Sequence, residues 1–240
     1  MDVGFSTQNG NISAQGSFAN VQSKDIHMDG VASVGDFAVN DVRADHSSTG
    51  SSLQVGSIDA KNLEEHLMGG KAGNISGSHI SVKAIDPTHY DASFGKVQAG
   101  DVQWKDSSLG SLDLNNTNAN IRDGSVNATV LSANMSDARF KNDQISTHAQ
   151  SGSLEGIRFT GKNDDIKGSV VSGNLNNMSA SVAGNDINID TLDFQGANTK
   201  NNAEGLDLQL NQAGASNINV SNDFASAGIQ NADITGANLQ

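Results

Sequence analysis

Short runs in which apolar and polar residues alternate constrain this 240-residue chain more than any other feature. Leu112-Asp113-Leu114, Ile187-Asn188-Ile189 and the longer run 206–210 all follow this pattern. Alternation with a period of two places one set of side chains on one face of a β-strand. The runs are bounded by Gly, Asn, Asp and Ser, which are the residues that tolerate turns. The pattern predicts an all-β protein.

A glycine rhythm accompanies these runs. Glycine, then a small or acidic residue, then an apolar residue recurs along the chain, and the intervals between its first six positions are 19, 21, 21, 23 and 24 residues. The phase continues more loosely to Gly236. Internal repeats of this length are typical of repeat architectures, so we expect a structural unit of about 22 residues. The positions are Gly16, Gly35, Gly56, Gly77, Gly100, Gly124, Gly152, Gly173, Gly196, Gly214 and Gly236.

Strands this short need neighbours, because an isolated strand pair is only marginally stable in water. Stacked coils would supply those neighbours, and the abundant Ala, Val and Ile would fill a narrow interior. The chain resembles secreted parallel β-helix repeat proteins in these respects. We therefore predict one elongated parallel β-solenoid (β-helix) domain over residues 1–240, belonging to a longer repeat array, with coils of about 22 residues.

Two segments interrupt the rhythm. Within residues 60–70, Leu63, Leu67 and Met68 share one helical face before Gly69-Gly70 ends the run. Residues 85–92 contain Pro87, which cannot donate a hydrogen bond to a strand ladder. We expect minor loop insertions at both places, and loops on a rigid scaffold are where binding residues concentrate.

Composition narrows the classes of function. The net charge is −13 and the 14 basic residues are scattered, which argues against nucleic acid and anionic membrane surfaces as partners. No run reaches the roughly 18 apolar residues of a membrane helix, so we expect no membrane insertion. The chain has no cysteine, which excludes disulfides and thiolate metal sites. We expect a secreted or cell-envelope protein.

The residues that could carry chemistry do not form a recognisable site. The six histidines show no metal-binding spacing, and acidic residues such as Asp164-Asp165, Asp186 and Asp190 form no distinctive pair. Sugar-binding grooves use exposed aromatic side chains, and besides phenylalanine only Trp104 and Tyr90 are available. We assign no catalytic, cofactor-binding or metal-binding residue, predict no enzyme and expect no cofactor. The histidines are His27, His46, His66, His79, His89 and His148.

Two short segments resemble known repeats. Residues 183–188 resemble half of the calcium-binding nonapeptide repeat, whose tandem copies build a cage of aspartate and carbonyl oxygens. One copy cannot complete that cage, so calcium is not predicted. Residues 232–239 resemble two units of the pentapeptide repeat, which agrees with coils that continue to the end of the chain.

Three functions are compatible with these features. We expect a structural or adhesive repeat segment of a bacterial surface protein, with a protein or glycan as its surface ligand; a homo-oligomer is also compatible. A second hypothesis rests on Gly110–Leu114 and Gly205–Leu210, which resemble the short strands of AsmA/TamB-like β-groove proteins. That resemblance implies an open groove that holds the acyl chains of lipids. The third is a β-helix that binds or cleaves glycans.

Overall fold

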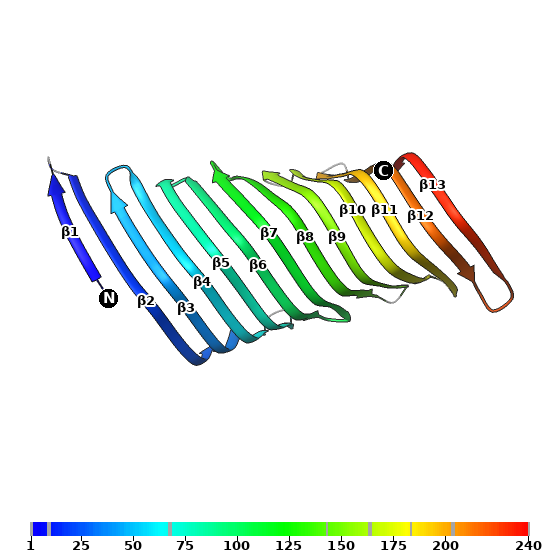
Figure 1. Ribbon diagram of the computed structural model, residues 1–240, viewed down its shortest axis with the longest axis horizontal. Helices are drawn as coiled ribbons and strands as arrows, with labels where there is room; N and C mark the ends of the chain where they lie inside the picture. Colours follow the sequence, from blue (N-terminus) through cyan, green and yellow to red (C-terminus); the bar gives the residue numbers. More distant parts are fainter. Residues whose placement is uncertain are drawn as a thin grey trace.

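Thirteen antiparallel strands form one sheet in the computed structural model, which describes residues 2–8, 11–66, 69–142, 144–162, 165–182, 184–202 and 205–239. The strands lie side by side in chain order, with β1 at one end of the sheet and β13 at the other (Figure 1). They are β1 Asp2–Gln8, β2 Asn11–Met28, β3 Ala32–Ser47, β4 Gly50–Glu65, β5 Gly70–Asp86, β6 His89–Trp104, β7 Ser107–Arg122, β8 Ser125–Lys141, β9 Ile145–Lys162, β10 Asp165–Val182, β11 Asn185–Asn202, β12 Gly205–Ser221 and β13 Ser226–Leu239.

The all-β prediction is confirmed and the parallel solenoid is wrong. Every neighbouring pair is antiparallel, and the sheet does not close on itself. From β2 onward, successive strands begin 18 to 21 residues apart, so the repeating unit is one strand with its turn and not one coil. Turns of a few residues join these strands, and only antiparallel strands accept such short connections.

Neither predicted loop insertion is present among the described residues. Residues 60–65 continue β4 as a strand, which replaces the helical face expected there; Leu67 and Met68 lie outside the described residues. Pro87 and Thr88 form the short turn between β5 and β6, and Tyr90 already belongs to β6. Pro87 is tolerated because it sits between strands, where no ladder hydrogen bond is required.

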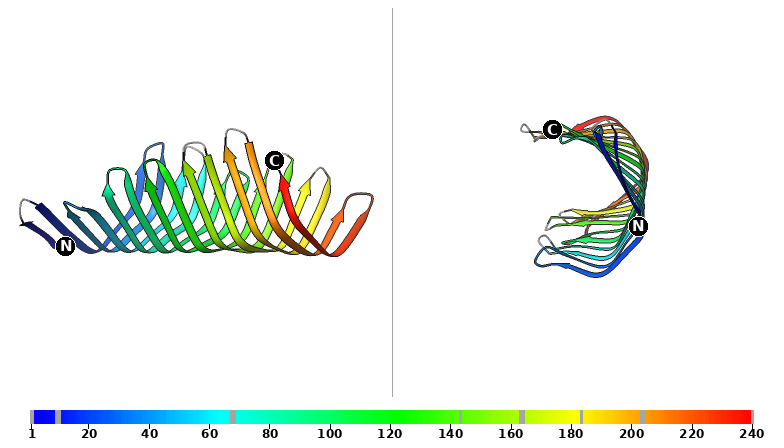
Figure 2. Two further views of the ribbon diagram at one scale, coloured as in Figure 1. Left: turned by 90° about the horizontal axis from the view of Figure 1, so that it is seen from above. Right: turned by 90° about the vertical axis from the view of Figure 1, so that its left-hand side faces the viewer.

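The sheet curls into a trough with a C-shaped cross-section (Figure 2). Residues with a positive φ occur inside the strands as well as in the turns, and their positions follow two rows that cross the sheet. The rows lie six residues apart on every strand from β2 to β13. We call them the first and second corner rows. The first row is Asp25, Gly35, Asn62, Gly73, Asp101, Gly110, Asp137, Gln150, Asn177, Asp190, Asn217 and Gln230; the second is Ala19, Asp41, Gly56, His79, Gly95, Asn116, Leu131, Gly156, Val171, Gly196, Asn211 and Gly236.

Left-handed residues alternate along each row. In the first row they stand on even-numbered strands, and in the second row on odd-numbered strands, so every facing pair contains one of them. Of these twelve left-handed residues, eight are Asp or Asn, three are glycine and one is His79. Asp, Asn and Gly are the residues that adopt this conformation at least cost.

The corners change the alternation of side chains. In β3 the apolar residues run Val34, Phe37, Val39, Val42 and Ala44, so the step across each corner is three residues where it is otherwise two. The same steps occur on the neighbouring strand, whose apolar residues face these across the ladder. Each corner therefore keeps the apolar side chains on one face of the sheet while the strand bends.

Candidate ligand-binding groove

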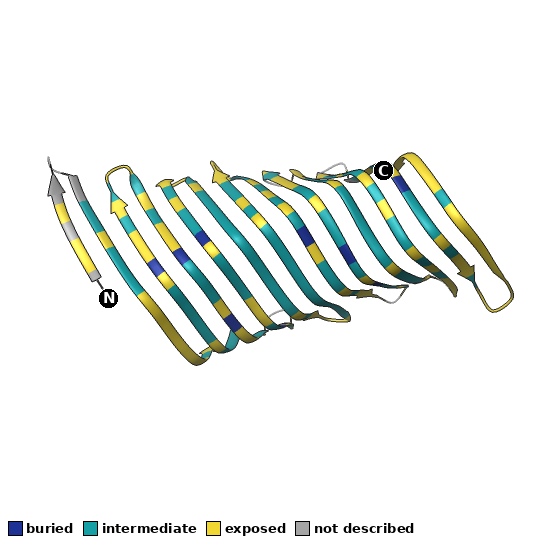
Figure 3. Ribbon diagram, in the orientation of Figure 1, coloured by how far each residue is buried: buried dark blue, intermediate teal, exposed yellow. Residues whose placement is uncertain are grey.

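The apolar face is the inside of the trough. Val42, Val55 and Ile80 lie on one side of the second corner row and are buried, while Val39 and Ile58 pack against them from the other side. Side chains on either side of a bend converge only on its concave face. All buried residues among those described are apolar, and Figure 3 shows them as isolated positions within a sheet of mostly intermediate exposure.

This face is continuous from strand to strand. Most cross-strand partners on it are apolar, and such pairs recur along the length of the sheet, as in Val39↔Ile58, Val97↔Leu114 and Ile189↔Ile218. No second layer covers it in the described part of the chain. Many lining side chains consequently remain partly exposed, among them Leu53, Ile75, Tyr90, Ile121, Phe159, Ile166, Leu208 and Val220.

Two hollows lie along this face, both between the second corner row and the nearby turns. One, of about 540 Å³, is formed by β9 to β13, and its apolar walls are Ile157, Phe159, Val170, Ala197, Leu208, Leu210 and Ala237. The other, of about 480 Å³, is formed by β1 to β6, and its apolar walls include Val3, Ala14, Ala44, Leu53, Val82, Ala84 and Tyr90. Mostly apolar hollows of this size are typical of sites for small hydrophobic ligands.

The outer face carries polar side chains that bond across the strands. Asn40 donates to Ser57 Oγ at 2.9 Å, and Asn115 donates to Ser132 Oγ at 3.2 Å. At the first corner row Asn217 donates to Asp190 Oδ2 at 2.8 Å. These contacts satisfy polar groups on the convex side, so the trough is apolar inside and polar outside.

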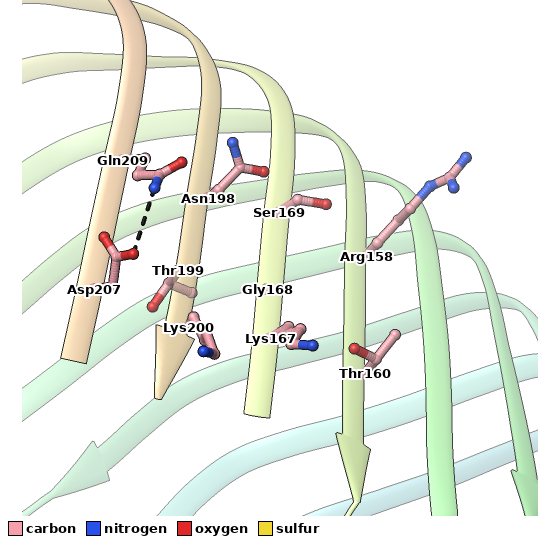
Figure 4. A pocket seen from close by; sticks show the side chains of 10 residues that line it. All are labelled: Arg158, Thr160, Lys167, Gly168, Ser169, Asn198, Thr199, Lys200, Asp207 and Gln209. Atoms are coloured by element: carbon pink, nitrogen blue, oxygen red, sulfur yellow. Dashed lines mark hydrogen bonds between the residues drawn. The ribbon is translucent and has the colours of Figure 1, made fainter. Parts of the chain in front are cut away.

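A polar hollow of about 370 Å³ lies among β9 to β12 and gathers three cations (Figure 4). Arg158, Lys167 and Lys200 come from three adjacent strands, and Lys167 lies directly opposite Lys200 across the ladder. Lys167 contacts Asp165 at 3.5 Å. Like charges at directly facing positions destabilise a strand pair, so this is a place of local strain in a chain that is acidic overall.

One acidic residue enters the same hollow. Asp207 Oδ2 accepts a hydrogen bond from Gln209 Nε2 at 3.4 Å, whereas its buried Oδ1 has no hydrogen-bond partner among the described residues. Asp207 faces Lys200 across the ladder, but no ion pair joins these two described residues. The carboxylate reduces the positive charge that an anion would meet there.

The candidate residues named from the sequence are not brought together. Asp165 lies at the start of β10, and Asp186 and Asp190 lie on β11, where Asp190 is engaged at a corner with Asn217; Asp164 lies outside the described residues. Tyr90 and Trp104 stand at opposite ends of β6, with Lys105 Nζ 5.1 Å from the Trp104 ring centre. Among the described candidates, no paired acids are flanked by aromatic side chains.

The histidines serve local contacts. His89 Nε2 lies 3.6 Å from Asp91 Oδ1, His148 Nε2 lies 3.5 Å from Asp137 Oδ1, and His79 is a corner residue. Across the described ranges, no group of three or more His, Cys, Asp or Glu residues is arranged to hold a metal ion. The half-motif around Gly184 lies at the turn between β10 and β11.

Two carboxyl groups in the described part of the chain have a lowered pKa. At the β5–β6 turn, the backbone N–H and hydroxyl of Thr88 both donate to Asp86 Oδ1 at 2.8 Å and lower the pKa of Asp86. The pKa of Glu64 is lowered by its hydrogen bond and charge interaction with Lys71, whose Nζ lies 2.8 Å from Glu64 Oε1. Both pairs are exposed, so they fix strand ends and mark no reactive site.

The glycine rhythm of the sequence does not reveal which residues line the groove. The signal that reveals them is the three-residue step between apolar residues, as in Val130 to Ala133 and Met135 to Ala138.

Comparison of the chain with family models, with curated proteins and with solved structures gave no match. Within the described ranges no helix is long and apolar enough to cross a membrane.

Proposed function

We propose that the chain is a non-enzymatic carrier that holds the acyl chains of lipids in its trough. The observation that supports this most directly is the uncovered apolar face, which continues across all neighbouring strands and contains two apolar hollows. A single-layer sheet ordinarily buries its apolar face against a second layer. A flexible apolar chain lying along the trough would provide that cover.

The dimensions of the trough favour an extended ligand. Neighbouring strands are about 4.8 Å apart, so twelve strand-to-strand steps make a trough of roughly 58 Å. Ala and Gly at many lining positions leave room for a narrow chain. The larger apolar side chains beside the second corner row pack against one another and stabilise the sheet. The β-groove hypothesis from the sequence fits this shape better than the structural or glycan-binding hypotheses do. A secreted or cell-envelope location remains part of the proposal.

A fluorescent fatty acid such as parinaric acid tests the proposal. We expect saturable binding to the intact chain, with emission that reports an apolar environment. The double variant Phe159→Gln with Leu208→Gln replaces two partly exposed walls of the larger hollow. Loss of about 1.4 kcal/mol of apolar contact corresponds to about tenfold weaker binding at that hollow.

A matched control changes the opposite face of the same two strands. Thr160→Gln with Asp207→Asn changes two residues that line the polar hollow and not the apolar one, so affinity should stay within about twofold of the parent chain. Circular dichroism on both variants checks that the sheet is retained. If neither the parent chain nor the control binds the probe, the lipid proposal fails, and a structural or adhesive segment becomes the better account of the chain.

A further inference from the structure

Three stretches of strand edge in this sheet have no neighbouring strand in the described part of the chain. They are the outer edge of β13, the outer edge of the short β1, and the outer edge of β2 from Ala19 to Met28, because β1 faces only residues 11–17. β13 contains no lysine or proline, and its Ile229 and Ile234 are 52% and 54% exposed. Natural proteins usually protect such an edge with charge, proline or a covering segment.

We infer that β13 of one copy pairs with β2 of a second copy, so that the chains join head to tail into one continuous trough. β13 and β2 run in opposite directions along the sheet, as successive strands in this fold do. The proposed register places Ala227 to Gly236 opposite Met28 to Ala19. The ladder ends at Gly236, because two residues further on Ser17 already faces Asp2 of β1.

The corner rows select this register. In every facing pair of both rows one residue is left-handed and the other is not. At the junction, left-handed Asp25 would face Gln230, and left-handed Gly236 would face Ala19. Both rows then continue from one copy into the next with their alternation intact.

The apolar face continues as well. The same register brings Ile229 opposite Ile26 and Ile234 opposite Val21, and all four belong to the inner face of their own sheets. Val21 is 46% exposed, which is high for an inner-face residue. On the outer face Asp233 would meet Gln22 with Lys24 at the diagonal position, so the charge pattern is favourable.

A two-fold pairing of β13 with β13 also satisfies the corner rows but is disfavoured by charge. It would set Asp233 directly against Asp233 of the second copy, and like charges at facing positions destabilise a strand pair. The head-to-tail junction has no such conflict. Because a head-to-tail contact uses two different edges, a dimer still presents one free edge of each kind, and further copies can add to give a series of oligomers.

The absence of cysteine makes a cross-linking test direct. A Gln22→Cys chain and an Asp233→Cys chain are each oxidised alone and are also oxidised as a mixture. Only the mixture should give a disulfide-linked dimer. The double variant should give a ladder of cross-linked species. As the register control, Ser23→Cys mixed with Asp233→Cys should cross-link at least tenfold less, since residue 23 points to the other face.

Sedimentation of the unmodified chain supplies a second measurement. We expect a concentration-dependent series of species without a limiting dimer. A monomer at all concentrations together with no cross-link in the mixture would overturn the inference. Dimers formed by Asp233→Cys alone, equal to those in the mixture, would also overturn it in favour of the two-fold pairing. Neither result depends on lipid binding, so the two proposals fail independently.

Discussion

Gly56 on β4 faces the left-handed residue Asp41 on β3, and a Cβ atom added to Gly56 would lie 2.9 Å from the Asp41 Cβ. The same close approach recurs at the first corner row, where a Cβ on Gly73 would lie 3.0 Å from the Asp101 Cβ. A left-handed residue turns its Cβ toward the facing strand. Glycine opposite it is therefore part of how the sheet bends.

Gly56→Ala should destabilise the fold by about 1–3 kcal/mol, because the added methyl overpacks a backbone contact. Urea unfolding followed by circular dichroism measures this. Gly161→Ala is the control, since its nearest contact would be Phe159 at an ordinary 3.5 Å. Equal effects at the two positions would contradict the account of the corner.

Replacing Asp41 tests the conformation of the corner itself. Asp41 has a φ of 53°, and a β-branched residue is strongly disfavoured there. Asp41→Val should cost about 1–2 kcal/mol or more in unfolding free energy, whereas Asp41→Gly should be tolerated. Thermal unfolding of the two variants side by side distinguishes them, and a Gly variant less stable than the Val variant would refute the assignment.

Ile80→Ala should lower the unfolding free energy by about 2–3 kcal/mol, because it removes a buried side chain from the cluster beside the second corner row. Ile85→Ala, on the same strand but 46% exposed, should stay within about 0.5 kcal/mol of the parent chain. Denaturant midpoints at equal slope measure both. A neutral result at Ile80 would mean that the concave cluster contributes little to stability.

The facing lysines of the polar hollow predict a salt effect. Lys167→Gln should stabilise the chain by about 0.2–1 kcal/mol at low ionic strength, because it removes repulsion from Lys200 and leaves the facing Lys200 and Asp207 in place. Its exposed contact with Asp165 contributes little. The gain should shrink as salt screens the charges. Melting temperatures at low and high salt test this, and Lys83→Gln, away from the hollow, is a control for the change in net charge.

The lowered pKa of Asp86 predicts acid sensitivity at the β5–β6 turn. A pKa that is lower in the folded state stabilises the fold above the unfolded pKa, and this contribution is lost as the pH falls through the folded value. Thr88→Ala removes the hydroxyl donor and should raise the pKa of Asp86, while Thr88→Ser should preserve it. Carboxyl NMR titration measures both variants; an unchanged pKa in Thr88→Ala would assign the whole shift to the backbone N–H.

The sequence alone determined that this protein is built from β-strands and turns. Runs such as Ile187-Asn188-Ile189 alternate with the period of a strand, and that period requires no knowledge of the neighbouring strand. The same pattern is compatible with parallel and antiparallel neighbours, so the direction of pairing was not decided by it. The acidic charge and the scarcity of aromatic residues were likewise readable from composition.

Only the tertiary structure decided that the sheet is an antiparallel trough with an uncovered apolar face. Asp, Asn and Gly favour left-handed backbone equally in a turn and in a corner, so Asp41 and Gly56 appear in the sequence as turn signals although they lie inside strands. Their role depends on the residue that faces them across the ladder, about 15 positions away in the chain. The groove exists because these local preferences align in two rows, and that alignment is a property of the assembled sheet.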